Sequence, residues 1–460
     1  MNDINKSIWY DGITTRLRYF MATFLLVLGF TINGYAQFIN QAITSSTFSA
    51  EINKADTTFL VIKNINIIDV VNGKNLIKRD VVIKGPFIYY IGNSFSETTS
   101  TNTKYIDGKG KYLCPGLWDM HFHMCWDKSN DTLLYPALLK NGIIGIRDMG
   151  GDLKIMNDFK RLKPENNLNI FGAGPMIDGN PPVYRDFSLP VDDSSDITKL
   201  LDSLKNNGSD FFKTYSLIKE EQLKEISTYC KKNDFHFAGH LSEYVKPETS
   251  IALGQKSIEH LNGLDEIWNE SKCRFDSLIN LMLTNQTYVC PTIIIYELKT
   301  KLRDTSIVNK GYSKYISSAL AHEWKITWAK RVEKHKKLQD WDALDKTYLS
   351  QLKLIGLLNK KGVMILAGSD FAGMPYVYPG ISLHQELKLL TKAGLSNNEA
   401  LKAATLNPVN FMKKENLYGS VTVGKFADLI ILDKNPLANI ENLKCIHEVI
   451  LKGKMVLKND

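Results

Sequence analysis

The chain has 460 residues and a formal net charge of +8, with 44% hydrophobic and 23% charged residues. This length exceeds one typical domain and allows a large core, although a single α/β barrel uses most of such a chain. The charge is modest and the lysines are spread along the chain, so the composition argues against nucleic-acid binding. Six scattered cysteines do not form a disulfide framework.

The N-terminal segment has the pattern of a signal peptide. Arg16 and Arg18 precede an apolar run over 20–32 that small residues follow. The run is shorter than the roughly 20 apolar residues that a membrane-spanning helix needs. The pattern predicts a signal peptide over 1–36, cleaved near Ala36, and hence export to the periplasm or the extracellular space. An uncleaved N-terminal membrane anchor is the alternative.

Residues 37–57 are mostly polar and predict a linker. From Thr58, short β-type runs are separated by Asn-Gly and Gly-Pro turns, which predicts hairpins. Short β-type runs separated by turns occur again over 427–457. The two strand-rich ends together predict one small β-sandwich domain, built from residues 58–114 and 415–460.

Between these ends, strand-like and helix-like segments alternate. The candidate strands are 117–123, 142–148, 168–173, 210–214, 235–240, 256–260, 287–292 and 363–368, with helical periodicity over 220–231 and 382–393. Eight such strands with intervening helices predict a (β/α)₈ TIM barrel over residues 115–414. The interval 293–362 is longer than one helix needs and predicts a helical insertion, which is either a lid over the barrel mouth or a plain helical hairpin.

Histidine, lysine and aspartate residues fall at the C-terminal ends of five of these strands, where barrel active sites lie. His121 and His123 are two residues apart, so on one strand their side chains point the same way. The other four residues are Lys213, His240, His260 and Asp370. Imidazoles and carboxylates bind divalent metals, so the combination predicts a metal site although each residue alone is a weak signal.

With these residues, the chain resembles the amidohydrolase superfamily, in particular its imidazolonepropionase-like and Xaa-Pro dipeptidase-like branch. The resemblance covers residues 58–460 and includes the runs Gly380–Leu387, Ala393–Leu401 and Gly419–Leu429. It implies a metal-dependent hydrolase in which a (β/α)₈ barrel is joined to a β domain formed by both chain ends.

The resemblance also implies a role for each residue of the first ion. His121 and His123 hold that ion, and Asp370 binds it and transfers the proton during catalysis. Two divalent ions, for which zinc is the expected metal, activate a water as hydroxide near neutral pH.

His240 and His260 are the implied ligands of the second ion, and Lys213 is the implied bridge, as a CO₂-derived carbamate. A lysine ammonium would repel a metal ion, which agrees with a modified lysine at this place. If Lys213 is unmodified, the site is expected to hold one ion.

The substrate is less well defined by the sequence. Tyr215 is a candidate hydrogen-bond donor to a substrate carboxylate or oxyanion, and Arg185 is a candidate carboxylate ligand. Many relatives carry a Gly-Gly-His segment near 172–185 and this chain does not. The substrate specificity of those relatives is therefore not assigned to this chain.

We expect an exported enzyme that cleaves a carbon–nitrogen bond of a small molecule or short peptide, as an Xaa-Pro dipeptidase or small-peptide carboxypeptidase. A cyclic-amide hydrolase of the imidazolonepropionase type is one alternative, and a catalytically silent barrel used for binding is another. We also expect a homo-oligomer.

Overall fold

The computed structural model of the chain describes residues 59–96, 103–126, 131–161, 168–304, 306–307, 313–338 and 341–458. The signal peptide predicted over 1–36 and the linker predicted over 37–57 lie outside the described residues.

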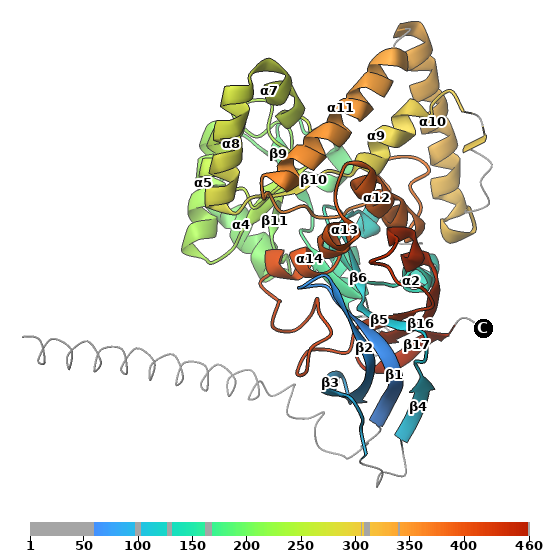
Figure 1. The fold of residues 1–460 in the computed structure, drawn as a ribbon. Helices are drawn as coiled ribbons and strands as arrows, with labels where there is room; N and C mark the ends of the chain where they lie inside the picture. Colours follow the sequence, from blue (N-terminus) through green and yellow to red (C-terminus); the bar gives the residue numbers. More distant parts are fainter. Residues whose placement is uncertain are drawn as a thin grey trace, which may run out of the picture. The chain divides into compact units, whose positions relative to one another are not determined.

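Strands from the beginning and the end of the described chain pair into one eight-stranded sheet (Figure 1). Its order is β17-β16-β15-β5-β1-β2-β3, and β4 pairs with β1. The strands are β1 (Phe59–Asp69), β2 (Lys74–Lys84), β3 (Phe87–Gly92), β4 (Thr103–Asp107), β5 (Tyr112–Pro115), β15 (Leu429–Leu432), β16 (Ile446–Leu451) and β17 (Lys454–Lys458). The antiparallel pairing of β5 with β15, in which Cys114 faces Ile430, joins the two ends of the chain.

Strand β1 is the centre of this sheet. It pairs in parallel with β4 along its first half and with β5 near Asn66, and two register shifts around Ile65 interrupt its pairing with β2. One face of the sheet has its own hydrophobic core, which includes Ile62, Ile83 and Ile431. The strands predicted as a sandwich of two sheets therefore pair as one continuous sheet, and the domain limits 58–114 and 415–460 stay a prediction.

The middle of the chain forms parallel strands in two further sheets. One has the order β6-β7-β8 and the other the order β10-β9-β11-β12-β13-β14. The strands are β6 (Leu117–Phe122), β7 (Ile143–Asp148), β8 (Asn169–Gly172), β9 (Met176–Gly179), β10 (Ser188–Val191), β11 (Phe212–Thr214), β12 (Phe237–Gly239), β13 (Ser257–Glu259) and β14 (Tyr288–Cys290). Seven of the eight predicted barrel strands are found here, with limits within two residues of the predicted ones.

The eighth predicted strand, 363–368, connects the two parallel sheets without being a regular strand. The backbone N–H of Leu366 donates to the carbonyl of Val289 on β14, and the N–H of Met120 on β6 donates to the carbonyl of Ala367. The segment is therefore extended and hydrogen-bonded on both sides, although only single bridges form there. These pairings agree with the predicted strand order, and closure into a complete barrel stays a prediction.

Strands β9 and β10 were not predicted. The sequence between Gly172 and Pro182 is rich in glycine and proline and resembles a loop, yet β9 pairs with both β10 and β11. The buried carboxylate of Asp178 stabilises the segment from β9 to β10, because it accepts hydrogen bonds from the backbone N–H groups of Val183 at 2.8 Å and Leu217 at 2.7 Å.

Helices follow most of the parallel strands. They are α2 (Asp131–Lys140), α3 (Leu153–Arg161), α4 (Ile197–Asn206), α5 (Glu220–Lys232), α6 (Pro247–Ala252), α7 (Leu264–Glu270), α8 (Lys272–Asn285), α9 (Ile293–Thr300), α10 (Ser318–Leu338), α11 (Trp341–Lys360), α12 (Ile381–Lys392), α13 (Asn397–Ala403) and α14 (Leu406–Phe411). The predicted insertion 293–362 contains α9, α10 and α11, as Figure 1 shows. Its packing places Trp328 of α10 against the ring of Tyr376, with 5.0 Å between ring centroids.

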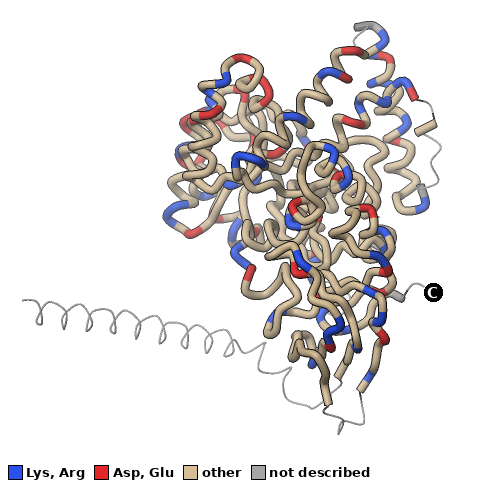
Figure 2. The backbone as a smooth tube through the Cα atoms, in the orientation of Figure 1, with Lys and Arg blue, Asp and Glu red and all other residues tan. Residues whose placement is uncertain are grey.

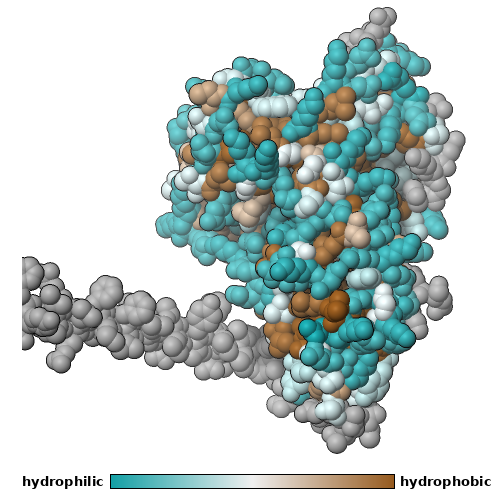
Figure 3. Space-filling model, viewed as in Figure 1, coloured by the Kyte–Doolittle hydropathy of each residue, from teal (hydrophilic) through white to brown (hydrophobic). Residues whose placement is uncertain are grey.

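Positively and negatively charged residues are interspersed along the outer helices (Figure 2). Hydrophobic residues also reach the surface among the hydrophilic ones (Figure 3). In the eight-stranded sheet, Ile77, Tyr105 and Met455 are exposed. Among the described residues, the helices are too short or too polar to cross a membrane.

Candidate metal centre

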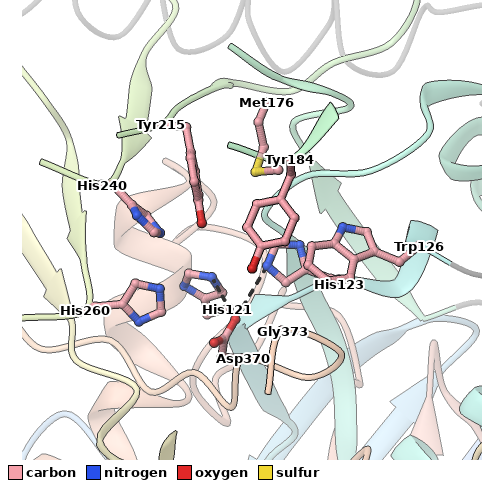
Figure 4. Close-up of a pocket in the computed structure, with 10 residues that line it drawn as sticks. All are labelled: His121, His123, Trp126, Met176, Tyr184, Tyr215, His240, His260, Asp370 and Gly373. Atoms are coloured by element: carbon pink, nitrogen blue, oxygen red, sulfur yellow. Dashed lines mark ion pairs between the residues drawn. The ribbon is translucent and has the colours of Figure 1, made fainter. Parts of the chain in front are cut away.

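A pocket of about 40 Å³ lies at the C-terminal ends of the parallel strands (Figure 4). Its walls are formed by His121, His123, Trp126, Met176, Tyr184, Tyr215, His240, His260, Asp370 and Gly373. Five of the six predicted metal ligands are in this set. The structure thus brings together residues that are up to about 250 positions apart in the sequence, as expected where strand ends meet.

His121 ends strand β6 and His123 follows it directly. The Nδ1 of His121 lies 2.9 Å from the Glu259 carboxylate, and the Nδ1 of His123 lies 3.0 Å from the carbonyl oxygen of Gly150. Both partners are acceptors, so each Nδ1 carries the proton and each Nε2 keeps its lone pair. The Nε2 atoms lie 3.3 and 3.5 Å from Oδ1 of Asp370.

His240 follows β12 and His260 follows β13. The Nδ1 of His260 lies 2.5 Å from the hydroxyl of Thr292, which donates its own proton to the carbonyl of Pro291. The Thr292 oxygen must therefore accept from His260, and Nε2 of His260 is again the free atom. The Nδ1 of His240 contacts the Ser216 hydroxyl at 3.3 Å. All four imidazoles thus have Nδ1 held by a protein group, which is the usual arrangement of metal-binding histidines.

Burial also keeps these imidazoles neutral. Desolvation holds the pKa of His121 and the pKa of His240 well below the usual value of 6.5, and it lowers the pKa of His260 to about 4. Because only a neutral imidazole has a lone pair to give, these histidines are ready to bind a metal ion at neutral pH.

Asp370 lies after the segment 363–368 and is buried. Burial opposes its ionisation, but the contacts with His121 and His123 together hold the pKa of its carboxyl well below the usual value of 3.8. The residue has a positive φ of 60°, and His260 one of 64°. Such strained backbone conformations in residues other than glycine concentrate at functional sites.

Lys213 is fully buried on β11, and its Nζ makes no hydrogen bond to any described residue. It does not line the pocket, yet its charge depresses the pKa of His121, His240 and His260, so it lies close behind them. Burial lowers the pKa of Lys213 itself to about 8. A buried, unpartnered ammonium is unfavourable, and this is the environment in which a lysine is most readily converted to an uncharged or anionic form.

A buried charged pair lies beneath the histidines and was missed by the sequence analysis. Arg147 on β7 donates to both carboxylate oxygens of Glu259 on β13, each at 2.8 Å, and both side chains are fully buried. Glu259 also accepts from Ser257 and from His121. His121, Glu259 and Cys290 lie near enough to hold an ion, but the oxygens of Glu259 are already engaged, so the group of His121, His123 and Asp370 suits a metal better.

Aromatic side chains form the mouth of the pocket. The ring of Tyr215 lies 4.1 Å from that of His240, and the ring of Trp126 lies 4.3 Å from that of His123 (Figure 4). Tyr184, in the segment between β9 and β10, contacts both Trp126 and Tyr215. Burial raises the pKa of Tyr215 far above the usual value of 10, so its hydroxyl stays protonated.

Of the two predicted substrate ligands, only Tyr215 lines the pocket. Arg185 is exposed, in the short 3₁₀ helix Arg185–Phe187, and its role as a carboxylate ligand stays a prediction.

The residues present fit a divalent metal centre. Four histidines and one carboxylate line the same small cavity, and the buried Lys213 amine behind them makes no hydrogen bond to a described residue. Nitrogen and oxygen donors of this kind bind Zn²⁺ and similar ions.

Comparisons with known proteins identify relatives along most of the chain. The model of the Amidohydrolase family matches residues 112–456. Ochratoxinase of Aspergillus niger is 23% identical over 454 residues, which cover 84% of each chain. A 5'-deoxyadenosine deaminase of Methanococcus vannielii is 23% identical over 431 residues and is covered to 93%.

Solved structures share the fold. A Xaa-Pro dipeptidase with bound methionine in its active site is similar with a TM-score of 0.67 at 20% identity, over 87% of this chain and 100% of that chain. The A. niger ochratoxinase structure gives a TM-score of 0.64 at 20% identity, over 88% of this chain and 97% of that chain. The chain belongs to the amidohydrolase family, and it is a hydrolase that acts on carbon–nitrogen bonds.

Proposed function

We propose that the protein is a metal-dependent amidohydrolase that cleaves an amide or peptide bond in a small molecule or short peptide. The observation that carries the proposal is the shared orientation of His121, His123, His240 and His260. Each has Nδ1 held by a protein group, and each lines the pocket that Asp370 also faces.

The proposal includes two divalent ions, with zinc as the expected metal. His121, His123 and Asp370 would hold one ion, His240 and His260 the other, and a carbamate on Lys213 would bridge them. Ions bound there would supply an activated water and polarise the scissile carbonyl group. The complete burial of Lys213 and its unpartnered amine support the carbamate, because an uncompensated ammonium is costly at this depth.

The chain's own residues carry the remaining chemistry. Asp370 is ionised at neutral pH, so it accepts the proton of the attacking water and passes it to the leaving nitrogen. The Tyr215 hydroxyl, protonated and on the pocket wall, donates a hydrogen bond to the oxygen on which negative charge develops. Trp126 and Tyr184 narrow the mouth and limit the access of bulk water.

A peptide substrate is the finer part of the proposal. It is supported by likeness to a solved Xaa-Pro dipeptidase and to a prolidase complexed with N-methylphosphonate-L-proline, for which the TM-score is 0.68 at 19% identity. The likeness to ochratoxinase keeps other amides open. We also propose export with cleavage near Ala36, which N-terminal sequencing of the secreted protein would test.

The test combines metal analysis with a substrate screen. The purified protein is expected to contain about two equivalents of zinc and to hydrolyse members of a panel of dipeptides and N-acyl amino acids. Asp370→Asn is expected to lower kcat by about 10²- to 10⁴-fold, the usual effect of losing an acid–base group. Asp193→Asn, at an exposed carboxylate, is the matched control and keeps full activity. A metal-free protein, or an Asp370→Asn variant with normal activity, would overturn the proposal.

A further inference from the structure

The helical insertion reaches the metal centre at the residue where α9 begins. Thr292 directly precedes α9 and is fully buried, and its hydroxyl contacts Nδ1 of His260 at 2.5 Å and donates to the carbonyl of Pro291 at 2.8 Å. Its backbone is left-handed, with a φ of 45°, which is rare for a β-branched residue. Because the hydroxyl contacts the ligand in this conformation, the backbone of Thr292 must be held there by other contacts.

The start of α9 lacks the hydrogen bond that a threonine at this position usually makes. The first backbone N–H groups of a helix have no partner within the helix, and the hydroxyl of a threonine before the helix commonly accepts from one of them. The Thr292 hydroxyl accepts from none of them. It is engaged by His260 and Pro291 instead, so the N–H groups of α9 need another acceptor.

Glu386 on α12 is that acceptor. Its side chain is fully buried, and its two carboxyl oxygens accept from the backbone N–H of Ile293 at 3.1 Å and from that of Ile294 at 2.8 Å. One residue of another helix thus satisfies both N–H groups at the start of α9. Glu386 takes the part that the Thr292 hydroxyl would otherwise have, and the hydroxyl stays available to His260.

A second hydrogen bond joins α9 to the loop that contains this ligand. Tyr296, in the first turn of α9, donates its hydroxyl proton to the side-chain oxygen of Asn262 at 2.7 Å. Asn262 follows His260 by two residues. Because α9 is bonded both to His260 and to the residue two positions later, a shift of its first turn would be transmitted to the ligand.

We propose that Glu386 is a positioning residue for His260 and that it acts through Thr292. This inference rests on the proposed function, in which His260 holds the second ion, and deepens it. Without the Glu386 carboxyl, the N–H groups of Ile293 and Ile294 are buried without an acceptor, which is unfavourable. The Thr292 hydroxyl can replace the lost acceptor. A capping threonine has an extended backbone, however, so Thr292 would leave its left-handed conformation and its hydroxyl would leave His260.

The test is a double-mutant cycle on metal affinity, with Glu386→Gln and Thr292→Val. Glutamine has nearly the same shape as glutamate, but its amide nitrogen cannot accept a hydrogen bond. Chelator competition is expected to show that Glu386→Gln weakens the binding of one zinc ion by roughly 10- to 100-fold, as is usual when the support of a ligand is lost, and leaves the other ion unaffected. In the Thr292→Val background, Glu386→Gln is expected to have no further effect, whereas a residue that only stabilises the fold would give additive losses.

The matched control is Glu399→Gln, at the carboxyl that accepts from the backbone N–H of Ser396 before α13 at 2.7 Å. The Ser396 hydroxyl accepts from Glu399 rather than from a histidine, so this variant is expected to bind both ions with wild-type affinity. If Glu386→Gln does not fold, Glu386→Asp, which withdraws the carboxyl by one methylene, replaces it with the same expectations. Unchanged metal affinity, or equal losses with and without the Thr292 hydroxyl, would show the inference to be wrong.

A measurement on the metal-free protein separates this inference from the proposed function. Nitrogen NMR of the protein labelled in its histidine rings reports which nitrogen of His260 carries the proton, and His260→Asn identifies the signals by their absence. We expect the proton on Nδ1 in the wild-type protein and a mixture of the two tautomers in Glu386→Gln. An unchanged tautomer refutes the positioning role whether or not the protein hydrolyses amides. The expected change in a protein that binds no metal would support the positioning role and refute the proposed function alone.

Discussion

The substitution Glu259→Gln tests how the buried charges support the metal centre. Glu259 accepts two hydrogen bonds from Arg147 at 2.8 Å and one from His121 at 2.9 Å, and all three side chains are buried. The substitution leaves the Arg147 cation buried without a counter-ion, and breaking a buried pair in this way costs about 3–5 kcal/mol. It also weakens the acceptor that orients His121, which is expected to lower metal affinity by about 10- to 100-fold.

Urea unfolding of the metal-free protein, followed by circular dichroism, measures the first effect, and competition with a chromogenic chelator measures the second. The matched control is Asp234→Asn. Asp234 pairs with Lys413 at the same 2.8 Å, but these side chains are 89% and 71% exposed. A surface pair of this kind contributes about 1 kcal/mol or less. If the two substitutions destabilise the protein equally, burial is not what makes the Arg147–Glu259 pair important, and the reasoning fails.

Three further substitutions test separate parts of the structure. Thr292→Val keeps the shape of the side chain but removes the oxygen that accepts the hydrogen bond from Nδ1 of His260. Chelator competition is expected to show roughly 10- to 100-fold weaker metal binding, and an unchanged metal affinity would contradict the assigned tautomer of His260. Gly239→Ala places a Cβ 1.9 Å from the carbonyl oxygen of Thr214, at a residue whose φ is +155°. Thermal unfolding is expected to show that the free energy of unfolding falls by at least about 1–3 kcal/mol. A normal Tm would show that β12 can move to avoid the contact. Burial raises the pKa of Glu386 from 4.5 to about 8, so between these values this carboxyl binds a proton in the folded protein but not in the unfolded chain. The free energy of unfolding should therefore fall as the pH rises from 4.5 to 8, and it should fall less steeply in Glu386→Gln. Identical slopes in the two proteins would refute this.

Much of the candidate site could be predicted from the sequence because strand periodicity and strand ends are local properties. His121 and His123 are two residues apart on a strand, and the other ligands follow strands whose apolar runs are easy to recognise. Once the strands are assigned in order, their carboxyl ends are expected to meet at one end of the barrel, so the position of the pocket could be predicted from the sequence.

The supporting residues could not be found in the same way. Arg147 and Glu259 are separated by more than 100 positions, and a charged residue inside a strand gives no indication of its partner. Thr292 supports His260 from the far side of the next strand, and its hydrogen-bond acceptor role depends on the carbonyl of Pro291. Strands β9 and β10 could not be recognised because the glycine- and proline-rich sequence before them favours turns, and the hydrogen bonds of Asp178 to the backbone of Val183 and of the more distant Leu217 outweigh that local preference.

The pairing of β5 with β15 has a consequence for the order in which the protein folds. Cys114 and Ile430 face each other across roughly 300 residues of intervening chain, so this contact carries a high cost of loop closure and forms late. During synthesis, the edge of β5 is therefore exposed until the C-terminal strands emerge, long after the parallel strands have been made. The nascent chain is most open to aggregation in that interval, and a chaperone that covers strand edges would be expected to act then.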